Sequence, residues 1–172
     1  MQPSPLARYL LAAYALLIIS ASLHPFTGWR DNGVPPLAFL SAPLPRYVTA
    51  FDVLANLLAY APLGFLAVLA FFPALRGAGA VVAAGLVAAA LSVSLELLQN
   101  YLPTRFASNL DVAANAAGGL LGGIFGAAFA GKLLRDAGLP ALRYRLFRTG
   151  VRIDLGLVLI GLWLVAQLNP GT

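Results

Sequence analysis

Long apolar runs separated by short polar segments dominate the chain. A helix needs roughly 20 apolar residues to cross a bilayer core about 30 Å thick, and five runs come close to that length. They cover residues 6–23, 48–72, 78–101, 110–131 and 151–168. The first run is short and contains Arg8, whose long side chain can reach the membrane interface. The pattern therefore predicts an all-α fold, a polytopic transmembrane helical bundle of about five spans.

The composition agrees with this prediction and excludes several other classes. Of the 172 residues, 60% are hydrophobic and 10% are charged, which excludes a soluble globular enzyme, a coiled coil and a disordered tail. The chain has no Cys, so disulfides, zinc–thiolate sites, iron–sulfur clusters and cysteine nucleophiles are excluded. We expect no cofactor and no nucleic-acid partner. The net charge of +5 favours membrane lipids as the anionic partner.

The basic residues predict how the spans are oriented, because cytoplasmic loops accumulate Lys and Arg. Eight of the eleven fall on the side of the amino terminus and three on the other side, so the amino terminus is predicted to be cytoplasmic. Six of the eight lie between residues 132 and 152, beside a leucine stripe at helical spacing. This segment is either a short helix on an anionic inner leaflet or an ordinary example of the positive-inside bias.

The first run and the end of the chain each allow a further prediction. The first run, with Arg8 ahead of its apolar stretch and Ser20-Ala21-Ser22 near its end, also resembles a cleavable signal peptide. The chain stops soon after the fifth run, which suggests the amino-terminal part of a longer product.

An internal repeat precedes the second and fourth runs. The segment from Arg46 to Asn56 matches the segment from Arg105 to Asn115 at a constant offset of 59 residues, with five of eleven positions identical. Because one span lies between the copies, both following helices cross the membrane in the same direction. The sequence therefore predicts a parallel internal duplication around spans two and four.

Each copy of the repeat starts its helix with Thr or Ser three residues before an Asp, Asp52 in the first and Asp111 in the second. This is the pattern of a capping box, in which a hydroxyl and a carboxylate satisfy free amides of the first turn. The two Asp residues therefore either serve only to cap the start of their helices or belong to a polar site. Asn56 and Asn115 lie one turn deeper on the same helix faces. They either form hydrogen bonds between helices or belong to that site.

Glu96 is the most informative residue. It lies near the carboxyl-terminal end of the third run, after nineteen uncharged residues, where the helix dipole disfavours an anion. No rule of local helix structure requires a carboxylate at this position. We therefore expect Glu96 to be paired with another group, to be protonated, or to point into a water-filled cavity. Gln99 shares its helix face, and Arg46 and Arg105 are candidate ion-pair partners. His24 ends the first run on the same side, as an interfacial anchor or as a further member of the site.

Two blocks of spaced polar, Pro and Gly positions carry a family resemblance. The first reads Asp52-x3-Asn56 followed by Tyr60-Ala-Pro62-Leu63-Gly64-Phe65. The second reads Ser94-Leu-Glu96-Leu-Leu-Gln99-x3-Pro103-x-Arg105-x5-Asp111-x3-Asn115-x2-Gly118-x3-Gly122. Together they resemble the VanZ-like family of bacterial integral membrane proteins over about residues 23–131. The chain departs from the usual pattern in Ala116, where Thr is common, and in its basic linker and fifth run.

The resemblance implies a multi-pass protein of the bacterial inner (cytoplasmic) membrane. The founding member of the family is associated with low-level resistance to the glycopeptide teicoplanin, and no reaction is established for the family. We therefore expect residues 1–131 to form a VanZ-like four-helix membrane domain. Residues 132–150 are expected to form a basic cytoplasmic linker, and residues 151–172 the fifth span with an outer terminus.

The first functional hypothesis is a binding protein whose outward-facing polar pocket engages a cell-envelope component such as a lipid-linked cell-wall precursor. Arginine suits a phosphate or carboxylate group, carboxylates accept an amine or hydroxyl, and amides complete the polar wall. The candidate binding residues are Arg46, Asp52, Asn56, Glu96, Gln99, Arg105, Asp111 and Asn115.

The alternative is an intramembrane enzyme, a hydrolase or transferase acting on a lipid-borne envelope substrate, with Glu96, Asp111 or His24 as general acid or base. No nucleophile elbow or phosphatase signature accompanies them. Asp52, Glu96 and Asp111 together also have the oxygen ligands that a hard cation prefers, but we assign no metal site.

A transporter is the third hypothesis, motivated by the duplicated hairpins and by Gly118-Gly119 and Gly122-Gly123 in the fourth run. Glycines at this spacing are more typical of close helix packing. The sequence leaves the oligomeric state open.

Overall fold

The computed structural model describes residues 4–45, 47–134 and 151–167, and every long element in these ranges is a helix. The helices are α1 (Pro5–Leu23), α2 (Ala50–Phe71), α3 (Gly77–Gln99), α4 (Asn109–Leu133) and α6 (Val151–Gln167), with a short 3-10 helix η1 (Ala38–Ser41). The predicted all-α fold is confirmed. Because long apolar runs fix where helices form in a bilayer, the five predicted runs agree with the observed helices to within about two residues at each end.

Four of the helices, α1 to α4, are long and apolar enough to cross a membrane. The fifth, α6, is apolar as well, and its 17 residues lie at the lower end of the spanning range. This agrees with the prediction of about five spans. Arg46, residues 135–150 of the predicted basic linker and residues 168–172 of the predicted outer terminus lie outside the described residues.

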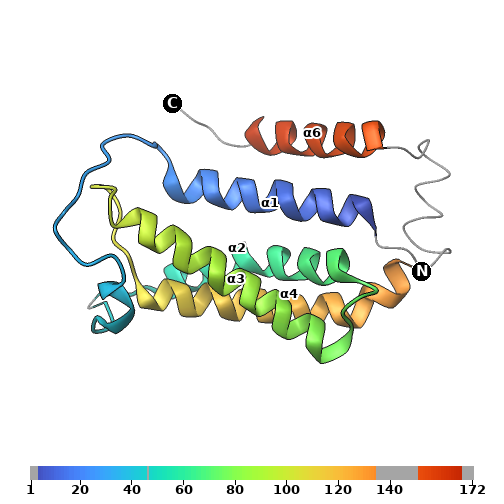
Figure 1. Ribbon diagram of the computed structural model, residues 1–172, viewed down its shortest axis with the longest axis horizontal. Helices are drawn as coiled ribbons and strands as arrows, with labels where there is room; N and C mark the ends of the chain where they lie inside the picture. The colour runs from blue at the N-terminus through green and yellow to red at the C-terminus, as the bar shows by residue number, and fades with distance from the viewer. Residues whose placement is uncertain (1–3, 46, 135–150, 168–172) are drawn as a thin grey trace.

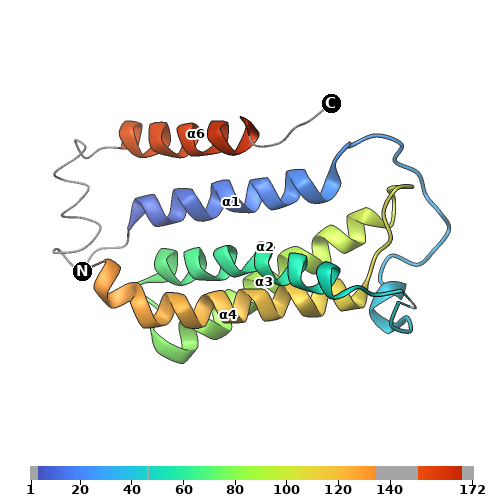
Figure 2. The ribbon, with the colours of Figure 1, turned by 180° about the vertical axis from the view of Figure 1, so that it is seen from behind.

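The helices form a compact group of three with two further helices added on one side (Figures 1 and 2). The most extensive interface joins α2 to α4, and α3 packs mainly against α4. On the open side of this group α1 packs against α2, and α6 lies on α1. The helices α2 and α4 run in the same direction, as predicted for the two helices of the repeat. The duplication itself remains a prediction.

Glycine permits the close approach of α2 and α4. Gly118 and Gly122 of α4 meet the backbone carbonyls of Leu57 and Ala61 of α2, and a Cβ at either glycine would overlap those carbonyl oxygens. Gly64 of α2 makes the reciprocal approach to the backbone of α4. Small residues at such positions allow two helix backbones to pack directly against each other. The close packing predicted for these glycines is therefore confirmed, and they give no support to a transport pathway.

The bundle has two chemically different ends. At the first, called the η1 end below, α1 and α3 finish and α2 and α4 begin. At the second, called the Arg8 end, α1 and α3 begin and α2 and α4 finish. This alternation follows from the short connections between consecutive spans, and it decides which polar residues can meet.

Candidate functional site

Every described residue that the sequence singles out for a site lies at the η1 end. Asp52 and Asp111 stand in the first turns of α2 and α4, and Asn56 and Asn115 lie one turn deeper in the same helices. Glu96 and Gln99 lie in the last turn of α3. Arg105 lies in the loop between α3 and α4, and His24 lies at the end of α1. Arg46 lies outside the described residues.

The first helix of the repeat begins with a complete capping box. The Thr49 hydroxyl accepts a hydrogen bond from the Asp52 amide at 3.1 Å, and the Asp52 carboxylate accepts one from the Thr49 amide at 3.1 Å. Two otherwise free amides at the helix start are thereby satisfied within one short segment. Asp52 is exposed, and α2 needs no other element to begin.

The second helix begins differently, because its capping carboxylate comes from another helix. The Ser108 hydroxyl accepts a hydrogen bond from the Asp111 amide at 3.3 Å, as predicted. The Ser108 amide, however, donates to the Glu96 carboxylate of α3 at 2.8 Å. Glu96 is 4% exposed. Glu96 thus meets a requirement that arises outside its own helix: the Ser108 amide at the start of α4 needs an acceptor, and Glu96 provides it from α3.

This arrangement leaves the Asp111 carboxylate outside its own capping box. Asp111 is partly buried and lies near the side chain of Asn56 on α2. The carboxylates of Asp52 and Glu96 are both close enough to interact with Asp111 electrostatically. We call Asp52, Glu96, Asp111 and Asn56 the acidic cluster. Among the residues that the structure describes, no Lys or Arg forms an ion pair with it.

A second group of polar side chains lies deeper between the helices. The Asn115 amide donates to the Ser92 hydroxyl at 2.8 Å, and both side chains are buried. The Tyr60 hydroxyl of α2 lies against Ser92. The side-chain oxygen Oδ1 of Asn115 is buried and has no hydrogen-bond partner among the described residues, which ordinarily costs about 1–3 kcal/mol. We call Tyr60, Ser92 and Asn115 the inner polar layer.

Gln99 and Arg105 connect this end of the bundle to α1. The Gln99 amide donates to the Ser22 carbonyl at 3.0 Å, and the Arg105 guanidinium donates to the carbonyls of Ala21 and His24 at 3.3 and 3.5 Å. Free carbonyls at the end of a helix attract donors and positive charge.

The considered ion pair between Glu96 and Arg105 is absent from the described part of the chain, because each partner is engaged elsewhere. Arg105 stays exposed. His24 is exposed too, and within the described residues only its backbone forms hydrogen bonds.

Asparagines that the sequence analysis left out of the site hold the long loop between α1 and α2 over this end. Asn100, which follows α3, donates to the Pro36 carbonyl at 2.7 Å and its own carbonyl accepts from Asn32 at 2.8 Å. Asn109, the first residue of α4, donates to the Ala42 carbonyl at 2.7 Å. The sequence did carry a signal for these contacts, because both asparagines stand at helix ends, where loop carbonyls without a partner are near.

Three exposed aromatic residues lie close in sequence to the starts of α2 and α4. Tyr47, Phe51 and Phe106 are 95%, 77% and 89% exposed. These rings therefore contribute almost nothing to the packing of the chain. Tyr47 and Phe106 occupy equivalent positions in the two copies of the repeat. Aromatic residues at such an end are typical of the membrane–water interface, and they are also available to contact a ligand.

The acidic cluster does not form the considered hard-cation site. Within the described ranges, no three His, Asp or Glu side chains lie close enough together to hold a metal ion. The geometry is instead that of a carboxylate and amide surface between α2, α3 and α4.

The comparison with known protein families agrees with the sequence motifs. The family model described as VanZ/LLP1 matches residues 6–130, from α1 to near the end of α4, and this match includes every candidate site residue named above. No curated protein and no solved structure matches the chain. Because the matched segment is more than half of the 172 residues, the chain belongs to the VanZ/LLP1 family of membrane proteins.

Proposed function

We propose that the η1 end binds the polar headgroup of a lipid-linked cell-wall precursor, with the acidic cluster as its central recognition element. The observation that carries the proposal is the position of Glu96. By accepting from the Ser108 amide, Glu96 takes over the capping task that Asp111 would otherwise perform. Asp111 can therefore turn toward Asn56 and Asp52, where it accepts hydrogen bonds from a ligand.

The chemistry of the cluster defines which ligand groups it suits. Carboxylates are pure acceptors, so they pair with hydroxyl, amide or amine donors, and hydrogen bonds to a charged acceptor are the stronger ones. Asp52 and Asp111 also repel each other without a cation among the described residues to offset the repulsion. A sugar hydroxyl or a peptide amine, both present in a cell-wall precursor, would satisfy the oxygens, and an amine would in addition relieve the repulsion.

Arg105 and the aromatic rings extend the proposed surface beyond the acidic cluster. The Arg105 guanidinium uses one nitrogen for its two described hydrogen bonds and remains exposed. Its other donors suit a phosphate group, which connects the lipid to the sugar in such a precursor. The exposed rings of Phe51 and Phe106 would lie at the level of the headgroup.

For Glu96 and His24, two of the three candidate acids or bases, the geometry favours binding over intramembrane catalysis. A general acid or base must reach the proton that it transfers. Glu96 is buried and accepts from the Ser108 amide. The His24 imidazole forms no hydrogen bond to any described carboxylate.

The proposed location of the site follows from the charge distribution. We place the protein in the bacterial inner membrane with its amino terminus in the cytoplasm, because most Lys and Arg residues fall on that side. The η1 end then faces away from the cytoplasm. A precursor in the outer leaflet would present its sugar and peptide at this level.

The binding experiment uses the full chain in lipid nanodiscs and a fluorescent lipid-linked disaccharide-pentapeptide. Asp111→Asn and Asp52→Asn should each weaken binding about tenfold, since a charge-assisted hydrogen bond contributes about 1.5–3 kcal/mol. Asp31→Asn is the matched control. Asp31 is exposed at the same end, and among the described residues its carboxylate accepts only from the Gly33 amide in a local turn.

Two results would contradict the proposal. The first is equal binding by the native chain and by both cluster variants. The second is equal weakening by Asp31→Asn, which would indicate attraction by overall charge alone. The lipid carrier phosphate without sugar or peptide serves as a second ligand. It should bind more weakly than the whole precursor and should not respond to Asp111→Asn.

A further inference from the structure

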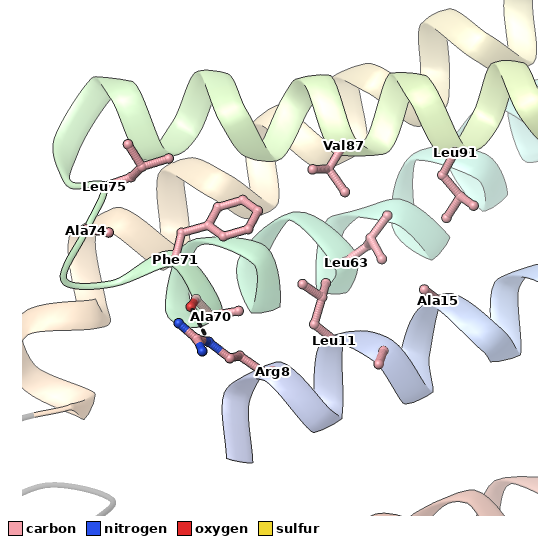
Figure 3. Close-up of a pocket in the computed structure, with 11 residues that line it drawn as sticks. Arg8, Leu11, Ala15, Leu63, Ala70, Phe71, Ala74, Leu75, Val87 and Leu91 are labelled. Carbon is pink, nitrogen blue, oxygen red and sulfur yellow. Dashed lines mark hydrogen bonds between the residues drawn. The ribbon is translucent and has the colours of Figure 1, made fainter. Parts of the chain in front are cut away.

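A cavity of about 600 Å³ opens near the Arg8 end and reaches the middle of the bundle, and no residue of the acidic cluster lines it (Figure 3). Its walls come from α1 and α3, with α2 and the turn that follows it between them. The lining is formed by Leu11, Ala12, Ala15, Leu63, Phe71 and Leu91 with five further residues, of which Arg8 alone is charged. The volume is in the range of small-molecule binding sites, which is about 300–1,000 Å³.

The cavity extends from the Arg8 end to the middle of the bundle. On α1 its lining runs from Arg8 to Ala15, seven residues further, which is about 10 Å along a helix. On α3 it reaches Leu91, just past the middle of that helix. The interface between α1 and α3 is small, and α6 packs against α1 without an appreciable interface to α3 within the described residues. No described helix therefore closes the gap between α1 and α3, and lipid chains can enter from the side.

Arg8 places a positive charge at one end of this apolar cavity. Its Nε donates to the Ala70 carbonyl at the end of α2 at 3.5 Å, and the side chain is exposed (Figure 3). This is the only hydrogen bond of the guanidinium among the described residues, none of which contacts its terminal nitrogens through a hydrogen bond. Arg76 lies in the neighbouring turn, directly after the lining residue Leu75, and none of the described residues that line the cavity is acidic.

We propose that this cavity is a phospholipid site, which holds an acyl chain of an anionic glycerophospholipid while Arg8 binds the lipid phosphate. The apolar walls provide the surface for the hydrocarbon chain, and the single cation at the end of the cavity fixes the depth of the headgroup. A guanidinium presents several donors to a phosphate in a planar arrangement. This site is separate from the acidic cluster, and it does not depend on the function proposed for the η1 end.

The first experiment locates the lipid with a photoreactive phosphatidylglycerol that carries a diazirine in the middle of one acyl chain. The full chain is purified in nanodiscs, irradiated and digested, and the adducts are mapped by mass spectrometry. We expect adducts concentrated on cavity-lining residues of α1 and α3 such as Ala12, Val87 and Leu91. Adducts spread equally over residues exposed elsewhere, such as Leu16 and Phe125, would overturn the proposal.

The second experiment measures lipid preference by native mass spectrometry of the same preparation. The native chain should retain phosphatidylglycerol over phosphatidylcholine, and Arg8→Gln should reduce this preference about fivefold, since a basic residue at a membrane surface contributes roughly that factor. Arg30→Gln, which removes one exposed charge at the η1 end, should leave the preference unchanged. Arg8→Lys keeps the positive charge and should retain most of the preference for phosphatidylglycerol.

A bulky substitution tests the cavity independently of the charge. Ala15→Phe should lower the retention of both lipids, because the new ring occupies the cavity. Leu16→Phe adds a ring on an exposed part of the same helix and should have no effect. Equal retention by Ala15→Phe and the native chain, or an undiminished preference in Arg8→Gln, would contradict the proposal. Arg8→Lys and Ala15→Phe keep the charge of α1, so they test the site even where Arg8→Gln fails to insert.

Discussion

Glu96 and Ser108 join the end of α3 to the beginning of α4 through a 2.8 Å hydrogen bond from the Ser108 amide to the Glu96 carboxylate. The corresponding contact in α2 is made within one segment, between the Thr49 amide and Asp52. The two copies of the repeat therefore start their helices with the same residue types and different partners. This difference releases Asp111 and couples the position of α3 to the start of α4.

Removal of the Glu96 carboxylate should destabilise the bundle. In Glu96→Ala the partly buried Ser108 amide loses its acceptor, and a donor left unsatisfied costs about 1–3 kcal/mol where water cannot replace the partner. Glu96→Gln keeps a carbonyl oxygen at the same position and should lose less than about 1 kcal/mol. The free energy of unfolding in detergent micelles, measured by denaturant titration, separates the two variants.

Asp52→Ala is the matched variant for this prediction. It removes the equivalent acceptor at an exposed helix start, where water replaces the lost partner, so its loss should be at the lower end of the range for a cap, about 0.5 kcal/mol. Equal losses in Glu96→Ala and Asp52→Ala would show that burial of the Glu96 contact has no energetic consequence.

Glycine packing between α2 and α4 gives the second prediction. In Gly122→Ala the new methyl group meets the Ala61 backbone, which cannot move away as a flexible side chain does. The helices must separate, with a loss of about 1–3 kcal/mol. Gly131→Ala is the control, because the space around Gly131 in the same helix is open. It should be neutral or stabilising by up to about 1 kcal/mol. Thermal unfolding followed by circular dichroism ranks the variants, and equal midpoints would argue against this interface.

Hydropathy sufficed to predict the helices and the end of the bundle at which the polar residues gather. Apolar runs near 20 residues fix the spans, and short connections make consecutive spans alternate in direction. Asp52, Asp111 and Glu96 must then lie at one end, because the first two begin their helices and the third ends its own. This much follows from the length of the runs and the order of the residues along the chain.

The partners of the polar residues could not be predicted in the same way. Arg105 follows Glu96 by nine residues and was a reasonable ion-pair partner, yet it donates to carbonyls at the end of α1. That choice depends on where α1 ends relative to the loop after α3, which no local pattern specifies. The ties from Asn100 and Asn109 to the loop between α1 and α2 likewise join residues more than sixty positions apart.

Arg105 should contribute more to ligand binding than to stability. Its two hydrogen bonds to α1 are long, at 3.3 and 3.5 Å, and the side chain is exposed. Arg105→Gln should therefore change the free energy of unfolding by less than about 1 kcal/mol. If Arg105 binds the precursor phosphate, the same variant should weaken binding of the lipid-linked precursor about fivefold or more. A variant that unfolds early and binds normally would assign Arg105 to structure alone.

The orientation of the bundle decides whether the acidic cluster can meet a partner outside the cytoplasm. The chain has no Cys, so single-cysteine variants report on one position each without background. Thr104→Cys is exposed at the η1 end and Ala78→Cys is exposed at the Arg8 end. With the amino terminus inside, a membrane-impermeant maleimide should label Thr104→Cys in intact spheroplasts, and Ala78→Cys only after lysis. Labelling of both variants after lysis controls for their reactivity. The reverse pattern would place the acidic cluster in the cytoplasm, and an outer-leaflet precursor could then no longer be its ligand.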